Sequence, residues 1–182
     1  MGSTPTLGTK NCIDIMAKML KLPIKGQWYD FDCGVRVAWS ILKYYKIQVT
    51  YETLLKTSKV CPVDGLKPPK LVNLLEKYDL NVICENNKNI RFLKKQITNN
   101  NPVIVLIQSR KEYKKSWSDS WIHGHYVVVM GFDDTRLFIY DPQMDGTIKI
   151  FTHENFYNRW HDYLNNIDYI RTVIYVNNEN RK

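Results

Sequence analysis

The chain has 182 residues, of which 44% are hydrophobic and 13% aromatic, so it is long enough for one well-buried core and too short to suggest two domains. No run of eighteen apolar residues and no signal peptide occurs, which argues against a membrane span and favours a cytoplasmic protein. The net charge of +8 comes from scattered lysines without interleaved aromatic residues, so we expect no nucleic-acid partner.

The N-terminal part of the chain gives weak structural signals. We expect residues 1–10 to form a flexible lead and residues 11–182 to form a single domain. Gly2 fits the pattern for N-myristoylation, and we expect membrane binding only if this residue is acylated. Residues 12–22 have enough apolar side chains for either a short amphipathic helix or an extended edge segment.

The stretch from Gln27 to Gly34 runs directly into residues 35–45, where apolar residues recur at helical spacing. We therefore predict a loop that ends in a buried helix, with Cys33 in the first turn. Unpaired backbone N–H groups and the positive end of the helix dipole favour a negative charge at this position. A cysteine held there as a thiolate is a candidate nucleophile, whereas the commoner role of a buried cysteine is that of a small hydrophobic residue.

The other cysteines, Cys12, Cys61 and Cys84, are widely spaced and form no C-x-x-C pair. No histidines at ligand spacing accompany them, which argues against a zinc site. We expect reduced thiols and neither a metal nor a cofactor.

Helical patterns continue through the first half of the chain. Thr50 is placed to cap a short helix, residues 69–78 carry several leucines on one stripe, and residues 90–97 have the spacing of another short helix. A short strand is expected over residues 80–84, and a loop over residues 99–102.

The second half of the chain favours strands. Residues 103–107 are consecutive apolar residues rich in β-branching, which predicts a strand covered on both faces. A long polar loop over residues 110–121 follows. Further strands are expected over residues 123–131, 136–140, 147–151 and 171–176, with a short helix over residues 154–160. This order predicts an α+β fold in which N-terminal helices pack on a C-terminal antiparallel sheet.

A predicted hairpin brings two polar residues together. With its turn centred near Asp134, His125 falls opposite residues 142–144, so Asp141 lies close to His125 at the open end of the pair. Cys33, His125 and Asp141 then match a nucleophile, a base and a residue that orients the base. The alternatives are a hydrogen-bonded core histidine at His125 and a turn former at Asp141.

Three neighbouring residues have related candidate roles. Gln27 lies six residues before Cys33, where its amide can complete an oxyanion hole with the Cys33 backbone N–H. Asp32 suits a helix cap. His123 is a rival base on the same strand face as His125.

Together these motifs resemble a known family. Residues 27–34, 124–129 and 140–142 are similar to the signature of the papain-fold cysteine peptidases that process bacteriocin leaders after a double glycine, together with their stand-alone relatives. The resemblance covers residues 26–176 and implies a papain-like cysteine peptidase fold.

The resemblance also implies roles for individual residues. It makes Cys33 the nucleophile, His125 the base, Asp141 the orienting residue and Gln27 part of the oxyanion hole. His123 lacks the glycine that precedes the base in the family.

Four further residues are candidates for substrate binding, namely Gly34, Trp117, Trp121 and Gly124. The two tryptophans suit either a substrate wall or ordinary anchors of a long loop. Relatives usually have a small residue or proline soon after the cysteine-glycine pair, whereas Arg36 here brings a cation near the predicted site.

We therefore expect a thiol hydrolase that cleaves a peptide or isopeptide bond of a peptide or protein substrate through an acyl-enzyme intermediate. The same groups suit a glutamine deamidase or a transglutaminase-type acyl transferase, because these reactions differ only in the leaving group and the acceptor. A second alternative is a catalytically inactive binding module with a basic surface.

Overall fold

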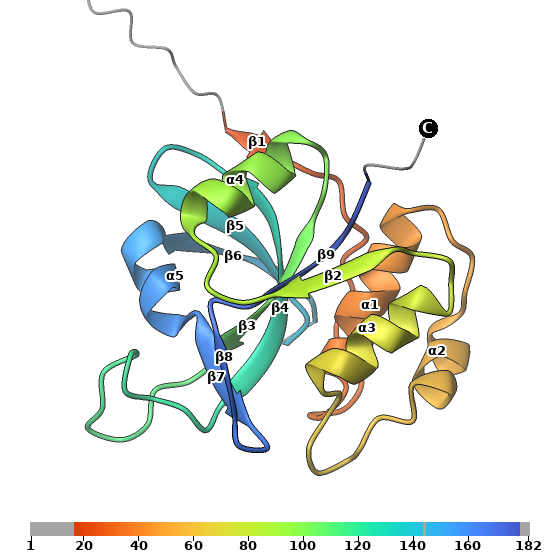
Figure 1. Ribbon diagram of the computed structural model, residues 1–182, viewed down its shortest axis with the longest axis horizontal. Helices are drawn as coiled ribbons and strands as arrows, with labels where there is room; N and C mark the ends of the chain where they lie inside the picture. Colours follow the sequence, from red (N-terminus) through yellow and green to blue (C-terminus); the bar gives the residue numbers. More distant parts are fainter. Residues whose placement is uncertain (1–16, 144, 179–182) are drawn as a thin grey trace, which may run out of the picture.

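The computed structural model describes residues 17–143 and 145–178, and Figure 1 shows how their helices and strands are arranged. The expected flexible lead, Gly2 and Cys12 lie outside the described residues. Within the described part of the chain, no helix combines the length and the hydropathy that a membrane span needs.

Helices form where the sequence supplies periodic apolar residues. They are α1 (Cys33–Tyr44), α2 (Tyr51–Ser58), α3 (Pro68–Glu76), α4 (Ile90–Thr98) and α5 (His153–Arg159). Side-chain caps fix three of the starts. Thr50 accepts a hydrogen bond from the Thr53 N–H at 3.2 Å, Asn89 accepts one from the Phe92 N–H at 2.9 Å, and Thr152 accepts one from the Asn155 N–H at 3.2 Å. The helices predicted from the sequence are thereby confirmed, each within a few residues of its expected bounds.

Most of the strands join one large sheet. They are β1 (Lys18–Met19), β2 (Val82–Glu85), β3 (Val103–Gln108), β4 (Gly124–Phe132), β5 (Arg136–Asp141), β6 (Thr147–Thr152) and β9 (Val173–Val176). The sheet has the order β2-β9-β3-β4-β5-β6, and β1 pairs with the far end of β4. Every pairing in it is antiparallel.

The sheet separates two hydrophobic clusters, which makes the fold three-layered. The first three helices pack on one face, through residues such as Leu42 and Leu71. The other two helices cover the opposite face, through Leu93, Phe156 and Trp160. Figure 1 shows these two groups of helices on either side of the central strands. All six residues of β3 are buried, as expected for a strand covered on both faces. The fold is the mixed helix and sheet arrangement predicted above, with helices on both faces of the sheet.

The structure decides between the two alternatives for residues 12–22 and adds a hairpin that was not predicted. Of residues 12–22, the described part contains the short strand β1, so the extended edge alternative holds there and the helix does not. The sequence reading also missed a two-stranded sheet of β7 (His161–Leu164) and β8 (Ile167–Ile170). Its turn, Asn165-Asn166, has positive φ at both positions, as a two-residue type I′ hairpin requires.

Candidate active site

The N-terminus of α1 presents Cys33. Asp32 occupies the cap position, but its side chain makes no bond to the amides of the helix. Its buried carboxylate accepts hydrogen bonds instead from the Trp28 N–H at 3.2 Å and from the Tyr51 hydroxyl at 2.7 Å. Asp32 therefore fixes the loop before Cys33 against α2, and the thiol is held at the first residue of the helix.

His125 and Asp141 meet where β4 begins and β5 ends. The Nε2 atom of His125 lies 2.8 Å from Oδ1 of Asp141, and both residues are almost completely buried. Two further groups hold the aspartate: the Gln143 N–H donates to Oδ1 at 2.8 Å, and Nζ of Lys149 on β6 lies 2.7 Å from Oδ2. The carboxylate is thus fixed in a position that orients the imidazole.

The imidazole also interacts with Cys33, through charge and a side-chain hydrogen bond. Because Nε2 is bonded to Asp141, Nδ1 is the ring nitrogen that remains for the thiol. Burial alone would lower the pKa of His125, but the interactions with Cys33 and Asp141 outweigh it and raise that pKa to about 9. An imidazolium ion is therefore the favoured form of His125 at neutral pH.

The pKa of Asp141 also favours the imidazolium form of His125. Burial tends to raise the pKa of its carboxyl group, but the bonds with His125, Lys149 and the Gln143 N–H outweigh this effect and hold the pKa at about 2. A permanently ionised carboxylate beside His125 stabilises the imidazolium form.

Gln27 lies at the same site. Its backbone N–H donates to the Pro142 carbonyl at 2.8 Å, which ties the loop before Cys33 to the end of β5. One side-chain hydrogen bond runs from Nε2 to the Tyr29 carbonyl at 2.9 Å. An amide nitrogen carries two hydrogens, so one donor is left after this bond, and Gln27 lines the same cavity as Cys33.

Two cavities flank the Cys33–His125 pair. The larger, of about 810 Å³, is lined by the loop of Gln27 and by residues 109, 110, 122 and 123, among others. The smaller, of about 220 Å³, lies toward the loop of residues 62–66 and strand β7. Cys33, Gly124 and His125 line both, so the cavities form one cleft that passes over the thiol.

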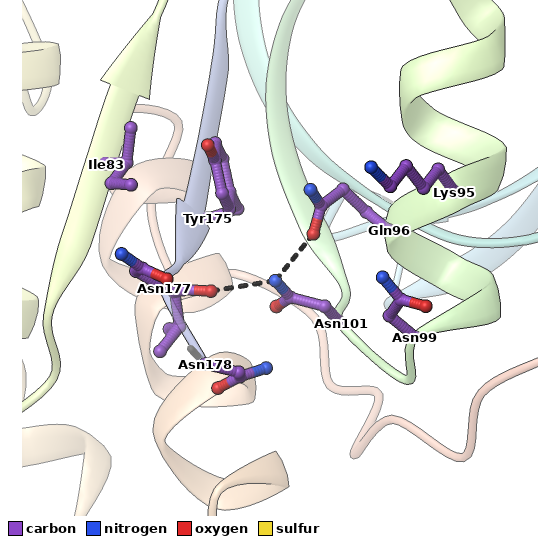
Figure 2. A pocket seen from close by; sticks show the side chains of 9 residues that line it. Ile83, Lys95, Gln96, Asn99, Asn101, Tyr175, Asn177 and Asn178 are labelled. Atoms are coloured by element: carbon purple, nitrogen blue, oxygen red, sulfur yellow. Dashed lines mark hydrogen bonds between the residues drawn. The ribbon is translucent and has the colours of Figure 1, made fainter. Parts of the chain in front are cut away.

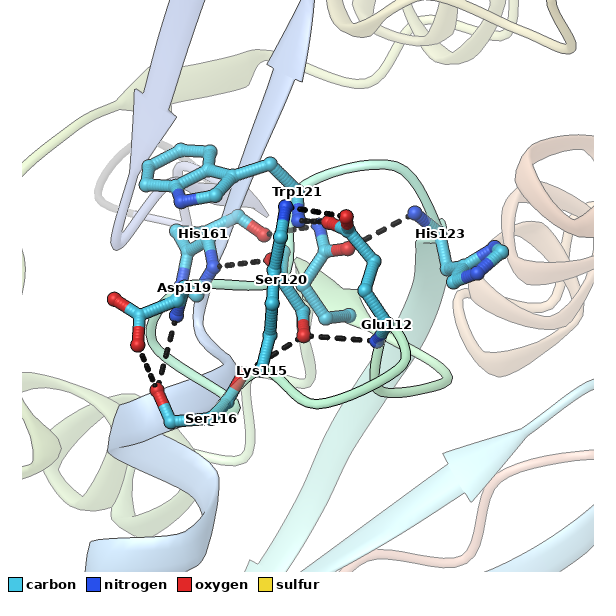
Figure 3. Close-up of polar contacts among 9 residues, drawn as sticks. Glu112, Lys115, Ser116, Asp119, Ser120, Trp121, His123 and His161 are labelled. Atoms are coloured by element: carbon cyan, nitrogen blue, oxygen red, sulfur yellow. Dashed lines mark hydrogen bonds and ion pairs between the residues drawn. The ribbon is translucent and has the colours of Figure 1, made fainter.

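The loop of residues 109–123 is held by a polar network, which Figure 3 shows. Glu112 accepts from the Trp121 N–H at 2.6 Å, and its own N–H donates to the Ser120 hydroxyl at 3.0 Å. The buried His161 donates from Nε2 to the Ser120 carbonyl at 2.9 Å. Trp121 packs on the His161 ring, with 4.2 Å between the ring centroids.

The structure does not bring the two tryptophans to Cys33. The Arg159 guanidinium lies over the ring of Trp117, 3.3 Å from its centroid, and Trp121 lines a separate cavity beside α5. Among the described residues that line the two cavities at Cys33, neither tryptophan occurs. Both act here as anchors of the loop.

Of the other candidates from the sequence, two line the cavities at Cys33 and one is buried in the protein. Gly124 lines both cavities, and His123 lines the larger one, where no bond joins its ring to Asp141 within the described structure. Gly34 is buried, and a Cβ atom there would lie 3.1 Å from side-chain atoms of Leu66 and Tyr126. Close packing inside the protein therefore accounts for a glycine at Gly34.

The cation expected near the site is held away from the cleft. Arg36 is buried, and its guanidinium lies over the Tyr51 ring, 3.3 Å from the centroid, with Trp28 and Trp39 also nearby. Cation–π contacts with these rings therefore stabilise the charge inside the layer of α1 and α2, and its Nε has no hydrogen-bond partner there.

A further cavity lies away from Cys33, beside β9, β2 and the end of α4 (Figure 2). Its polar centre is Asn101, whose Nδ2 donates to Gln96 Oε1 and to the Val176 carbonyl, each at 2.8 Å. These bonds tie the end of α4 to β9, which is a structural role.

Sequence reasoning missed Lys149 and Asp162, because only the folded chain brings them to the site. Lys149 reaches Asp141 through the pairing of β5 with β6, and Asp162 on β7 lines the smaller cavity. The adjacent pair Asn165-Asn166, which forms the turn of the β7–β8 hairpin, was the available sequence signal for Asp162. No cluster of metal-ligating side chains occurs in the described part of the chain.

Comparison with known proteins identifies the family of this chain. The model of the peptidase C39 family matches residues 21–167. A putative C39-like peptidase from Bacillus anthracis is similar in structure, with 19% sequence identity and a TM-score of 0.70 over 88% of this chain and 97% of that one.

Two further structures are similar at lower scores. A double glycine motif protease from an AMS/PCAT transporter, in complex with its leader peptide, shares 20% identity with a TM-score of 0.61, over 87% of this chain and 94% of that chain. The peptidase domain of Streptococcus ComA shares 21% identity with a TM-score of 0.59, over 87% and 96%. A search of curated proteins found no match.

Proposed function

Because the chain belongs to the peptidase C39 family of cysteine peptidases, we propose that it hydrolyses a peptide or isopeptide bond with Cys33 as nucleophile, His125 as acid and base, and Asp141 as orienting residue. The observation that carries this assignment is the buried His125–Asp141 pair, at 2.8 Å, beside a thiol at the start of a helix. The two most similar structures named above share this fold, which supports a peptidase cleft here.

The proposed reaction begins with an ion pair. The Cys33 thiolate attacks the carbonyl carbon of the scissile bond, and the oxyanion that forms accepts hydrogen bonds from the Cys33 N–H and the Gln27 amide. The His125 imidazolium gives its Nδ1 proton to the leaving nitrogen, the C–N bond breaks, and a thioester with Cys33 remains.

Water then releases the acyl group. Neutral His125 takes a proton from the attacking water, the C–S bond breaks, and the products are a free carboxylic acid and the restored thiolate–imidazolium pair. Asp141 keeps its negative charge throughout and stabilises the imidazolium.

The larger cavity suits a peptide substrate. Trp28, Tyr29, Val63 and Ile122 line it and expose half or more of their surface. Apolar rims of this kind suit an extended chain with hydrophobic side chains. No observation favours glutamine deamidation, acyl transfer or a purely binding role over hydrolysis, and the cytoplasmic location stays a prediction.

The test is the Cys33→Ala variant on a library of cellular peptides, with new termini identified by mass spectrometry. We expect the wild type to produce new termini and the variant to lose at least ~10³-fold in rate, because the nucleophile is gone. Cys84→Ala is the matched control, since Cys84 lies on β2 and lines neither cavity. Undiminished cleavage by Cys33→Ala would refute the assignment.

A further inference from the structure

The smaller cavity contains a buried carboxylate without a counter-ion. Asp162 is 2% exposed and lines the wall of this cavity together with Cys33. Its Oδ1 accepts from Gln108 Nε2 at 3.2 Å, and the Tyr163 N–H also donates to the carboxylate. Its Oδ2 has no hydrogen-bond partner, and none of the ion pairs found among residues 17–143 and 145–178 involves Asp162.

A second unpartnered polar atom lies in the same wall. The hydroxyl of Tyr126 is buried and bonded to no group, and Tyr126 and Asp162 are close enough to interact electrostatically. Ten buried side-chain polar atoms of the described residues have no partner, and these two are the ones whose residues line the smaller cavity. A ligand that supplies donors in this cavity would satisfy both together.

The carboxylate is held against the backbone of Gly124. A Cβ atom at that position would lie 2.1 Å from Asp162 Oδ2, so only glycine leaves room for the carboxylate beside the strand that carries His125. A glycine before His125 is therefore required in this chain, because it leaves room for the Asp162 carboxylate at the cleft.

The rest of the cavity combines apolar walls with negative charge. Four apolar side chains supply the walls: Phe31, Leu66, Leu106 and Leu164. Asp30 and Asp64 stand at the exposed side of the cavity, with Asp64 3.8 Å from Lys67, and no lysine or arginine lines it. The one cationic group in the lining, His125, is already paired with Asp141. This local acidity stands out in a chain of net charge +8.

We propose that the smaller cavity is a specificity subsite that binds a lysine or arginine side chain of the substrate, with Asp162 as the residue that determines the preference. The inference rests on the proposed function, because the bound side chain must belong to a residue near the scissile bond at Cys33. The apolar walls contact the aliphatic stem of the side chain, and its charged end pairs with the Asp162 carboxylate, beside the Tyr126 hydroxyl.

Other side chains fit this cavity less well. Glycine would leave both buried polar atoms unpaired, an aliphatic side chain supplies no donor, and a carboxylate is repelled. Burial raises the pKa of Asp162 to about 6, so at neutral pH its carboxyl group is mostly ionised and ready to pair with a cation.

The experiment uses short peptidyl acyloxymethyl ketones that alkylate Cys33, with lysine, norleucine or glutamate placed at each of the two residues nearest the ketone. Norleucine keeps the aliphatic stem of lysine and removes the charge. We expect lysine to label the wild type at least about tenfold faster than norleucine at one of these positions, and glutamate to be slowest.

Three variants locate the origin of the preference. Asp162→Asn should bring the ratio of lysine to norleucine close to one, and Tyr126→Phe, which removes only the hydroxyl, should reduce it. Asp168→Asn is the matched control, since Asp168 is an exposed carboxylate on β8 that lines neither cavity, and it should leave the ratio unchanged.

Equal rates for lysine and norleucine at both positions in the wild type would overturn the subsite. So would a preference that survives in a folded Asp162→Asn variant. Iodoacetamide separates this failure from failure of the proposed function, because it tests the thiol without using the subsite. A Cys33 that reacts no faster than Cys84 with iodoacetamide would refute the nucleophile, and the subsite with it.

Discussion

A buried carboxylate without a counter-ion lowers the stability of the folded protein. Burial raises the pKa of Asp162 from its ordinary 3.8 to about 6, against the opposing effects of Gln108 and the Tyr163 N–H. The phenols of Tyr126 and Tyr169 face it and are neutral at physiological pH. The folded state therefore binds more protons than the unfolded state between pH 4 and pH 6, and stability falls as the pH rises through this range.

The substitution Asp162→Asn removes that charge. We expect it to raise the free energy of unfolding by about 1–3 kcal/mol at pH 8, where the wild-type carboxyl group is ionised, and to change little at pH 4, where it is protonated. Urea unfolding of both proteins at the two pH values measures the difference.

A variant that is destabilised at pH 8 would show that Asp162 has a stabilising partner, which contradicts the description of its Oδ2 as unpaired. Greater stability with a weaker preference for lysine would instead place Asp162 among residues retained for function at a cost in stability.

At the level of elements, the β4–β5 hairpin brings His125 and Asp141 together, which are the proposed base and its proposed orienting residue. Val128 pairs with Tyr140, and the same register, continued toward the open end, places His125 opposite residue 143. A β-bulge between Val129 and Gly131 lies beyond this segment, so it does not shift the register near His125. The next pairing, of β5 with β6, supplies Lys149 to the second oxygen of Asp141.

Asp141→Asn tests what this hairpin does for His125. The carboxylate helps to raise the pKa of His125 to about 9, so its loss lowers that pKa, and the imidazolium deprotonates at lower pH. We expect kcat/KM to fall roughly 10²-fold, with the alkaline limb of its pH profile shifted to lower pH.

Lys149→Gln is the comparison variant for this experiment. It removes the ion pair with Asp141 but leaves the carboxylate, so its alkaline limb should stay at or above the wild-type position. An unshifted alkaline limb in Asp141→Asn would show that the aspartate does not set the protonation of His125.

Local sequence signals predicted most elements. The cap at Thr50 and the apolar spacing of α1, α3 and α4 are properties of short segments, and the structure confirms the helices they indicated. The β7–β8 hairpin was missed because its strands are short and half exposed. The two adjacent asparagines at its turn were the signal, and their significance depends on the turn geometry.

In the candidate site, too, some features could be predicted from the sequence and others could not. A hairpin of ordinary register was enough to predict that His125 and Asp141 lie close together, and the structure places them 2.8 Å apart. The position of Asp162 depends on a crossing of segments distant in sequence, which no local pattern encodes. Trp117 and Trp121 precede the histidine in sequence, but their loop folds toward α5 and leads them away from Cys33.

For the molecule as a whole, the site lies where two layers meet. The N-terminus of α1 comes from the layer of three helices, whereas His125 and Asp141 come from the ends of two central strands. Both groups rest on a buried core, which limits their movement relative to each other. The α+β class was predictable from the order of helices and strands. The division of helices between the two faces was not, because it depends on how the chain crosses the sheet.

The central claim is that Cys33 and His125 form a thiolate–imidazolium pair, and the most direct measurement is the pH dependence of alkylation at each cysteine, read by mass spectrometry. Cys61 and Cys84 are free thiols and serve as the internal controls. We expect Cys33 to react rapidly down to about pH 5, while the controls react only near or above about pH 8.5. If Cys33 follows the same pH dependence as the controls, the pair does not exist and the proposed nucleophile is wrong.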